Sequence, residues 1–132
     1  MKKLWLLLII AAYLTGCSSH QMRGQFDESL HEYNESLRWN AWNKTGLYPA
    51  HSILEEFNRR VAAAEKVRVV DCRIVSETYN EGHREATVRV DIDYYKVPSQ
   101  TVRTLHDTQK WAYLEENGTK GWRLVSLFPE FR

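Results

Sequence analysis

Residues 86–95 carry the pattern that most constrains the fold of this chain of 132 residues. Apolar side chains occupy every second position, and charged residues, threonine or tyrosine fill the positions between them. The apolar set is Ala86, Val88, Val90, Ile92 and Tyr94. A period of two places such a set on one face of a β-strand. We therefore expect a strand whose apolar face packs on the domain and whose other face, with Asp91 and Asp93, meets solvent or a partner.

Three further segments have strand character. From Val67 onward, Val70, Cys72 and Ile74 alternate with polar residues, which predicts a strand with a buried, inert Cys72 thiol. Residues 101–115 form the next candidate strand. The segment 117–121 contains an Asn-Gly pair typical of a hairpin loop, and residues 122–127 follow it as a last strand. The sequence thus predicts about four antiparallel strands.

The region before the strands has helical periodicity. Apolar residues recur at spacings of three and four, which predicts a helix from about residue 21 to 43. Gly46 and Pro49 end this helix, and Ser52 with Glu55 indicates a capping box that opens a second helix ending near Lys66. Helices followed by strands favour an α+β fold, in which N-terminal helices pack on one face of a curved antiparallel sheet.

Charge and motif content exclude several function classes. The chain has 18 Lys and Arg against 17 Asp and Glu, with no basic block, so we expect no nucleic-acid partner. The sequence lacks His-x-x-x-His, paired cysteine motifs, dense carboxylate loops and glycine-rich phosphate loops. We therefore expect no metal and no cofactor.

The N-terminus carries the signature of an export signal. Met1-Lys2-Lys3 precedes the mostly apolar stretch Leu4 to Leu14, which ends in Leu14-Thr15-Gly16-Cys17. This ending resembles the lipobox of bacterial lipoproteins. The resemblance implies cleavage before Cys17, acyl chains such as palmitate on Cys17, and membrane attachment through those chains. It divides the chain into a signal peptide at 1–16, a lipidated tether at 17–21 and a single α+β domain at 22–132.

The resemblance also implies an address. Ser18 rather than aspartate follows the cysteine, which in Gram-negative members of that family implies the periplasmic face of the outer membrane. An uncleaved anchor is disfavoured because eleven helical residues cover about 16 Å of a hydrocarbon core of roughly 30 Å. A cleaved signal without lipid remains an alternative. Lipid on Cys17 leaves Cys72 without a disulfide partner.

A second resemblance covers nearly all of the domain. The segment Tyr33 to Trp42, read as YNESLRWNAW, and the terminal Trp122-Arg123-Leu124-Val125-Ser126 resemble small proteobacterial lipoproteins of the nuclear transport factor 2-like superfamily. This resemblance implies a cone-shaped pocket between the concave sheet and the helices. Members use the pocket for catalysis or small-molecule binding, or use the fold to dimerise or scaffold, so the fold leaves function open.

Aromatic side chains are the candidate pocket lining. Trp39 and Trp42 lie three apart on the expected helix, where they either fill the core or, if exposed, indicate a partner or lipid surface. The full candidate lining is Tyr33, Trp39, Trp42, Tyr94 and His106.

The acid/base candidates are few, namely His51, His83, His106, Asp91, Asp93 and Asp107. His106 and Asp107 are neighbours in a strand and face opposite sides, so they cannot form a dyad by adjacency. We assign no catalytic residue. We expect a membrane-anchored periplasmic lipoprotein with a non-catalytic binding or scaffolding domain, which meets a protein partner or a second copy through the sheet. The alternative is a small pocket enzyme, dehydratase- or isomerase-like, with a His or Asp base.

Overall fold

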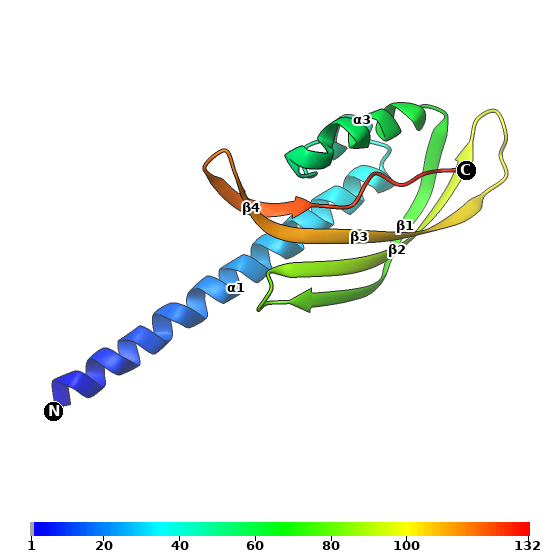
Figure 1. The fold of residues 1–132 in the computed structure, drawn as a ribbon. Coiled ribbons are helices and arrows are strands. Elements are labelled where there is room, and N and C mark those ends of the chain that lie inside the picture. Colours follow the sequence, from blue (N-terminus) through cyan, green and yellow to red (C-terminus); the bar gives the residue numbers. More distant parts are fainter. Residues whose placement is uncertain (1) are drawn as a thin grey trace.

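The computed structural model describes the backbone of residues 2–132 and the side chains from Ser18 onward. Three α-helices and one 3-10 helix precede four strands (Figure 1). The helices are α1 (Lys2–Arg38), α2 (Trp42–Thr45), η1 (His51–Ile53) and α3 (Leu54–Ala63). The strands are β1 (Val67–Asn80), β2 (Glu85–Lys96), β3 (Arg103–Glu116) and β4 (Thr119–Leu124). The predicted α+β class is confirmed.

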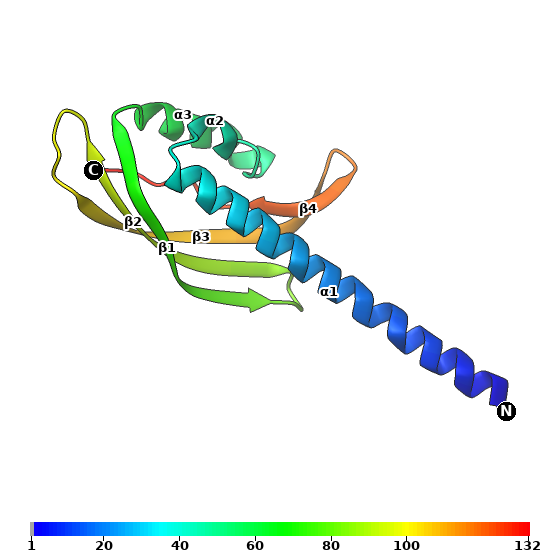
Figure 2. The ribbon, with the colours of Figure 1, turned by 180° about the vertical axis from the view of Figure 1, so that it is seen from behind.

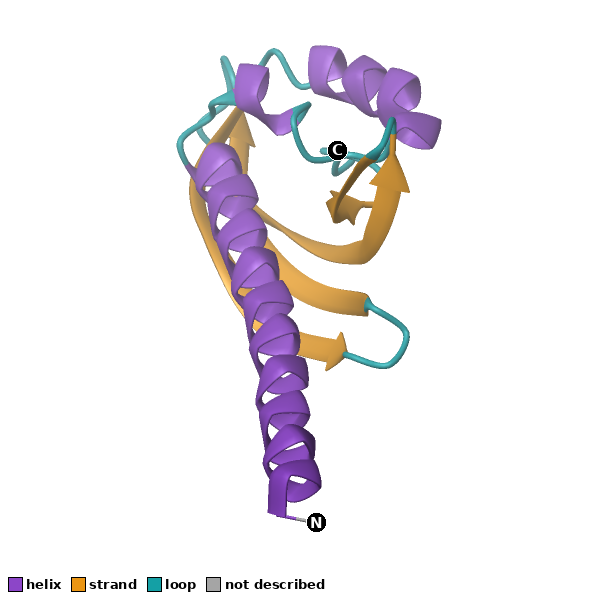
Figure 3. Cartoon of the chain, turned by 90° about the vertical axis from the view of Figure 1, so that its left-hand side faces the viewer, coloured by secondary structure: helices purple, strands orange, loops and turns teal. Residues whose placement is uncertain are grey.

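The strands form one antiparallel sheet in the order β1-β2-β3-β4. Helix α1 runs along the inner face of this curved sheet beside β1, and its N-terminal part extends beyond the sheet (Figure 2). Helices α2 and α3 cover one end of the sheet (Figure 3). Among the residues whose side chains are described, no helix combines the length and apolar character needed to cross a membrane.

The alternation in β2 is confirmed. Its five apolar residues from Ala86 to Tyr94 are buried, while the residues between them are exposed or half-buried. The inner face of the sheet and α1 enclose a core rich in aromatic rings. Six of these rings, all at most 5% exposed, are Phe26, Tyr33, Phe57, Trp111, Trp122 and Phe128. Tyr33 meets Trp111 edge-on with ring centres 5.8 Å apart, a favoured aromatic geometry.

The predicted end of the first helix is wrong. Helix α1 ends at Arg38, because Asn40 takes a left-handed conformation with φ of 56°. The Ala41 amide then donates to the Ser36 carbonyl at 2.9 Å, and the Asn40 amide donates to the Leu37 carbonyl at 3.2 Å. These two hydrogen bonds are the pattern of a Schellman C-cap. Trp42 therefore begins a separate short helix, and Trp39 and Trp42 do not share one helix as expected.

Asn40 also fastens α1 to the sheet. Its side-chain amide donates to the Val69 carbonyl at 3.2 Å, and its side-chain oxygen accepts from the Val69 amide at 2.7 Å. The register between β1 and β2 shifts directly after Val69. Consequently Val70 is 54% exposed, whereas alternation with Cys72 and Ile74 predicted that it would share their face.

Two local predictions at element ends are corrected. Helix α3 begins at Leu54 with Ile53 at its N-cap and no side-chain cap, so Ser52 and Glu55 do not form the expected capping box. Ser52 lies instead in η1. The turn after β3 needs only Asn117 and Gly118, whose φ angles are 52° and 76°. Strand β4 therefore starts at Thr119, earlier than the predicted residue 122.

Candidate functional site

A polar cluster lies inside the mostly apolar interior between α1 and β3. Val88 of β2 faces Gln109 of β3, so the Gln109 side chain points to the inner face of the sheet, where it is 1% exposed. Its amide donates to the Asn34 side-chain oxygen of α1 at 2.8 Å, and the Asn34 amide donates back at 3.3 Å. The Asn34 amide also donates to the Leu30 carbonyl at 2.8 Å. This reciprocal pair satisfies two buried amides that would otherwise destabilise the core.

Three ionisable groups surround the amide pair. Asp107 lies two residues before Gln109 on the same inner face, opposite Val90, and burial raises the pKa of its carboxyl to about 6. Burial, followed by the charge of Asp71, raises the pKa of the Cys72 thiol to about 12. Burial and then the Asp107 carboxylate raise the pKa of Tyr33 well above its usual range. The Tyr33 hydroxyl is fully buried and has no hydrogen-bond partner among the residues that the structure describes.

His106 points away from this cluster. As expected for neighbours in a strand, it lies on the outer face of the sheet, where its Nδ1 is 2.6 Å from an Asp91 carboxylate oxygen. Asp93 on the same face accepts from Arg73 at 2.6 Å and from Thr104 at 2.6 Å, and these bonds, Arg73 first, lower the pKa of Asp93. The outer face is thus a polar ladder of paired charges. Such exposed pairs contribute little to stability.

The other two histidine candidates also lie at the surface. His51 is paired with Glu116, with 3.3 Å between its Nδ1 and the carboxylate. His83 is exposed in the turn between β1 and β2. Of the acid/base candidates, Asp107 alone is on the inner face. Alternation along the strand separates His106 from Asp107, and the burial of Val90 opposite Asp107 is the signal that selects the aspartate.

The five candidate lining residues do not form one pocket. Tyr33 lies in the core, while Trp42 packs edge-on against Phe128 with ring centres 5.5 Å apart. Tyr94 is buried and contacts Phe131 at 4.9 Å between ring centres. His106 is on the opposite face of the sheet, and Trp39 is at the surface with 70% exposure.

Trp39 instead borders a surface groove that sequence analysis did not predict. The groove has a volume of about 460 Å³ and runs between the last turns of α1 and the segment containing α2. Its lining includes His31, Glu32, Glu35, Trp39, Lys44 and Tyr48. The indole Nε1 of Trp39 donates to Glu35 at 2.8 Å, and the Tyr48 hydroxyl donates to Glu32 at 3.2 Å. The chain reversal at Asn40 creates this groove.

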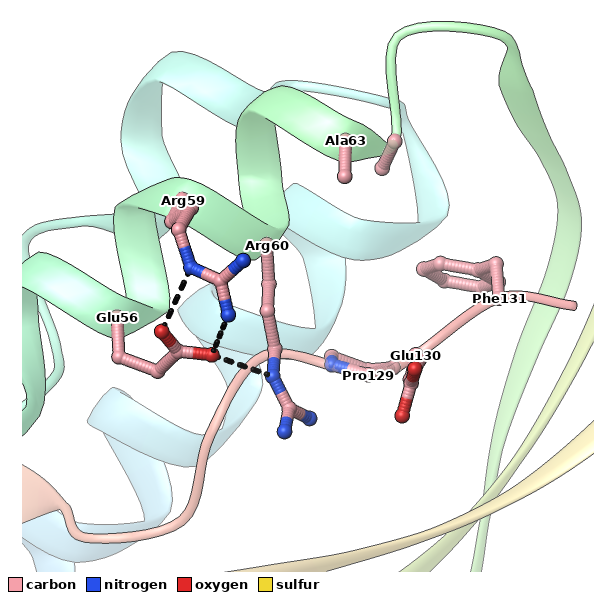
Figure 4. Close-up of a pocket in the computed structure, with 8 residues that line it drawn as sticks. Glu56, Arg59, Arg60, Ala63, Pro129, Glu130 and Phe131 are labelled. Carbon is pink, nitrogen blue, oxygen red and sulfur yellow. Dashed lines mark hydrogen bonds and ion pairs between the residues drawn. The ribbon is translucent and has the colours of Figure 1, made fainter.

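A smaller cavity of about 180 Å³ separates α3 from the C-terminal segment (Figure 4). Arg59 donates to Glu56 at 2.6 Å and 2.7 Å, and Arg60 bonds both Glu56 at 3.4 Å and the Phe128 carbonyl at 3.3 Å. The charges on α3 that border this cavity are therefore engaged with one another. Within the part of the chain that is described, no three His, Cys, Asp or Glu residues come together as metal ligands.

No protein-family model matches the sequence, and no characterised protein matches it. Among solved structures, the chain is similar to the intermembrane space region of the chloroplast protein ARC6, with 12% identity and a TM-score of 0.39. That alignment covers 76% of this chain and 91% of the other.

Proposed function

We propose that this chain is a lipid-anchored protein of the bacterial envelope whose domain binds a partner at its surface and performs no catalysis. The observation that carries the second half of this proposal is the filled interior. The space that the nuclear transport factor 2-like resemblance assigns to a pocket holds the rings of Phe26, Tyr33 and Trp111, each at most 1% exposed. A binding function supported by this geometry therefore lies on the outside of the domain.

The anchor rests on the Leu14-Thr15-Gly16-Cys17 motif, because the Cys17 side chain lies outside the described residues. Among the described side chains of α1, Phe26 is the first that is fully buried. It lies nine positions after Cys17 along the helix, a rise of about 14 Å. An acylated Cys17 would thus hold the buried part of the domain about two and a half helical turns from the membrane surface, on the periplasmic face of the outer membrane.

Fractionation of cells that express the full chain tests this proposal. The wild-type protein should appear in the outer-membrane fraction and enter the detergent phase on phase separation. The Cys17→Ser variant should be released from the membrane or retain its leader. Cys72→Ser is the matched control and should partition as the wild type does. A Cys17→Ser protein that partitions with the outer membrane like the wild type contradicts the anchor.

One observation favours the second candidate function, a small pocket enzyme with an aspartate base. Asp107 is a largely buried carboxyl without an ion-pair partner among the described residues, and it lies close enough to the unpartnered Tyr33 hydroxyl to raise its pKa. A base and a hydroxyl donor are the parts that an isomerase or dehydratase needs. Thermal-shift measurements with small ketones and hydroxy acids test it. A ligand that raises the melting temperature of the wild type and of Asp91→Asn, but not of Asp107→Asn or Tyr33→Phe, supports this second candidate function.

A further inference from the structure

The groove beside Trp39 combines features that indicate a particular kind of partner. At 70%, Trp39 is among the most exposed large apolar side chains that the structure describes. Its indole donates to Glu35 one helical turn earlier at 2.8 Å. The ring therefore lines the groove while its Nε1 is bonded to the Glu35 carboxylate. An exposed, hydrogen-bonded tryptophan next to a concavity is the kind of residue that anchors protein interfaces.

The acidic side of the groove extends along α1. Glu28, Glu32 and Glu35 precede Trp39 at spacings of four, three and four residues, so all four lie on one face of the helix. Glu28 and Glu32 are exposed, and Glu35 is half-buried. Lys44 is the cation that lines the groove on the opposite side. This face presents more negative than positive charge to a partner.

A cation from the neighbouring residue already lies near the Trp39 ring. The guanidinium carbon of Arg38 lies 5.8 Å from the centre of the indole, within the range of a cation–π contact. A cation that entered the groove would meet both the ring and the carboxylates of Glu32 and Glu35. Anionic lipid surfaces and nucleic acids would meet repulsion from the same carboxylates.

We propose that the groove between α1 and α2 binds a basic segment of a protein partner, with a lysine or arginine side chain seated between Trp39 and Glu35. This inference rests on the proposed function, since it names the chemistry of the partner that a surface-binding domain would take. Glu28 and Glu32 then act at the rim, where charges speed association and set its salt dependence.

Fluorescence anisotropy on the full chain in detergent tests the inference. The probe is a fluorescein-labelled peptide of twelve residues that alternate lysine and serine, and its counterpart alternates glutamate and serine. The lysine peptide should bind saturably and more weakly as salt rises. Trp39→Ala should weaken binding about tenfold and Glu35→Gln several-fold. Leu47→Ala is the matched control for Trp39, because Leu47 is 68% exposed and lies outside the groove lining. Glu81→Gln, in the turn after β1, controls for the loss of one charge.

Several results overturn the inference. These are no saturable binding of the lysine peptide, equal binding of the glutamate peptide, or equal losses in the control variants. Sedimentation that shows a dimer abolished by Trp39→Ala would also overturn it, because a second copy would then occupy the groove. If the Cys17 fractionation succeeds and the peptide assay fails, the proposed anchor stands and this inference falls. If the peptide binds and Cys17→Ser remains in the outer membrane, the groove inference stands and the proposed anchor falls.

Discussion

Asn40 provides the sharpest test of how the helical and strand-forming halves are joined. Its left-handed backbone ends α1, and its side chain exchanges two hydrogen bonds with Val69 at the start of the register shift in β1. Asn40→Gly keeps the backbone conformation accessible and removes both side-chain bonds. With about 1 kcal/mol for each partly buried hydrogen bond, this variant should lose about 2 kcal/mol of unfolding free energy. Asn40→Ala should lose about 1 kcal/mol more, because its β-carbon disfavours a positive φ.

Urea denaturation followed by circular dichroism measures both values. The midpoint should fall in the order wild type, Asn40→Gly, Asn40→Ala, with an unchanged slope. In thermal melts the two variants should unfold about 8 °C and 12 °C earlier. Asn117→Gly is the matched control, because Asn117 also has a positive φ, of 52°, while its side chain makes only a long exposed contact of 3.4 Å with His51. The reasoning is refuted if Asn40→Gly is as stable as the wild type, or if Asn40→Ala is no less stable than Asn40→Gly.

Four further outcomes follow from burial. Trp111→Ala should cost about 3 to 5 kcal/mol in urea denaturation, because the ring is 1% exposed; a loss below about 1 kcal/mol contradicts the filled core. Trp39→Ala should change the free energy of unfolding by less than about 0.5 kcal/mol in the same assay. A large loss would mean that Trp39 stabilises the folded domain, which contradicts its assignment as a surface residue. Burial raises the pKa of the Asp107 carboxyl to about 6 from the ordinary value of 3.8. The ionised carboxylate therefore lowers the free energy of unfolding by its full amount above about pH 6 and has no effect below pH 3.8. Asp107→Asn should therefore stabilise the protein by up to about 3 kcal/mol at pH 7.5 and not at pH 3.5, and a pH-independent difference would refute this. Because the pKa of Cys72 is about 12, its thiol should react with iodoacetamide at pH 8 about a hundred times more slowly in the folded than in the unfolded protein. Peptide mapping by mass spectrometry measures both rates, and equal rates would contradict the burial of Cys72.

The parts of the fold that sequence predicted are those set by local periodicity. The alternation from Ala86 to Tyr94 fixed one face of β2, and its extension to β3 separated His106 from Asp107. The end of α1 was not predictable in this way. Asn40 ends the helix through its left-handed backbone, and its side chain bonds Val69, a residue 29 positions later, so the periodicity before Trp42 could not reveal this end.

The candidate site was less predictable than the fold. The groove exists because the chain reverses at Asn40 and places Lys44 opposite Glu35, an arrangement that no spacing in the sequence encodes. Likewise, the pairing of Asn34 with Gln109 joins residues 75 positions apart. Position on the inner face of the sheet, rather than residue type, distinguishes Asp107 from the half-buried Asp91 and Asp93 on the outer face.

Mass spectrometry of the protein isolated from membranes tests the central claim most directly. If the chain is a lipid-anchored envelope protein, the mature polypeptide begins at Cys17, and its first residue carries the mass of attached acyl chains. An intact chain that retains residues 1–16, or a processed chain whose amino end carries no lipid, would contradict the account.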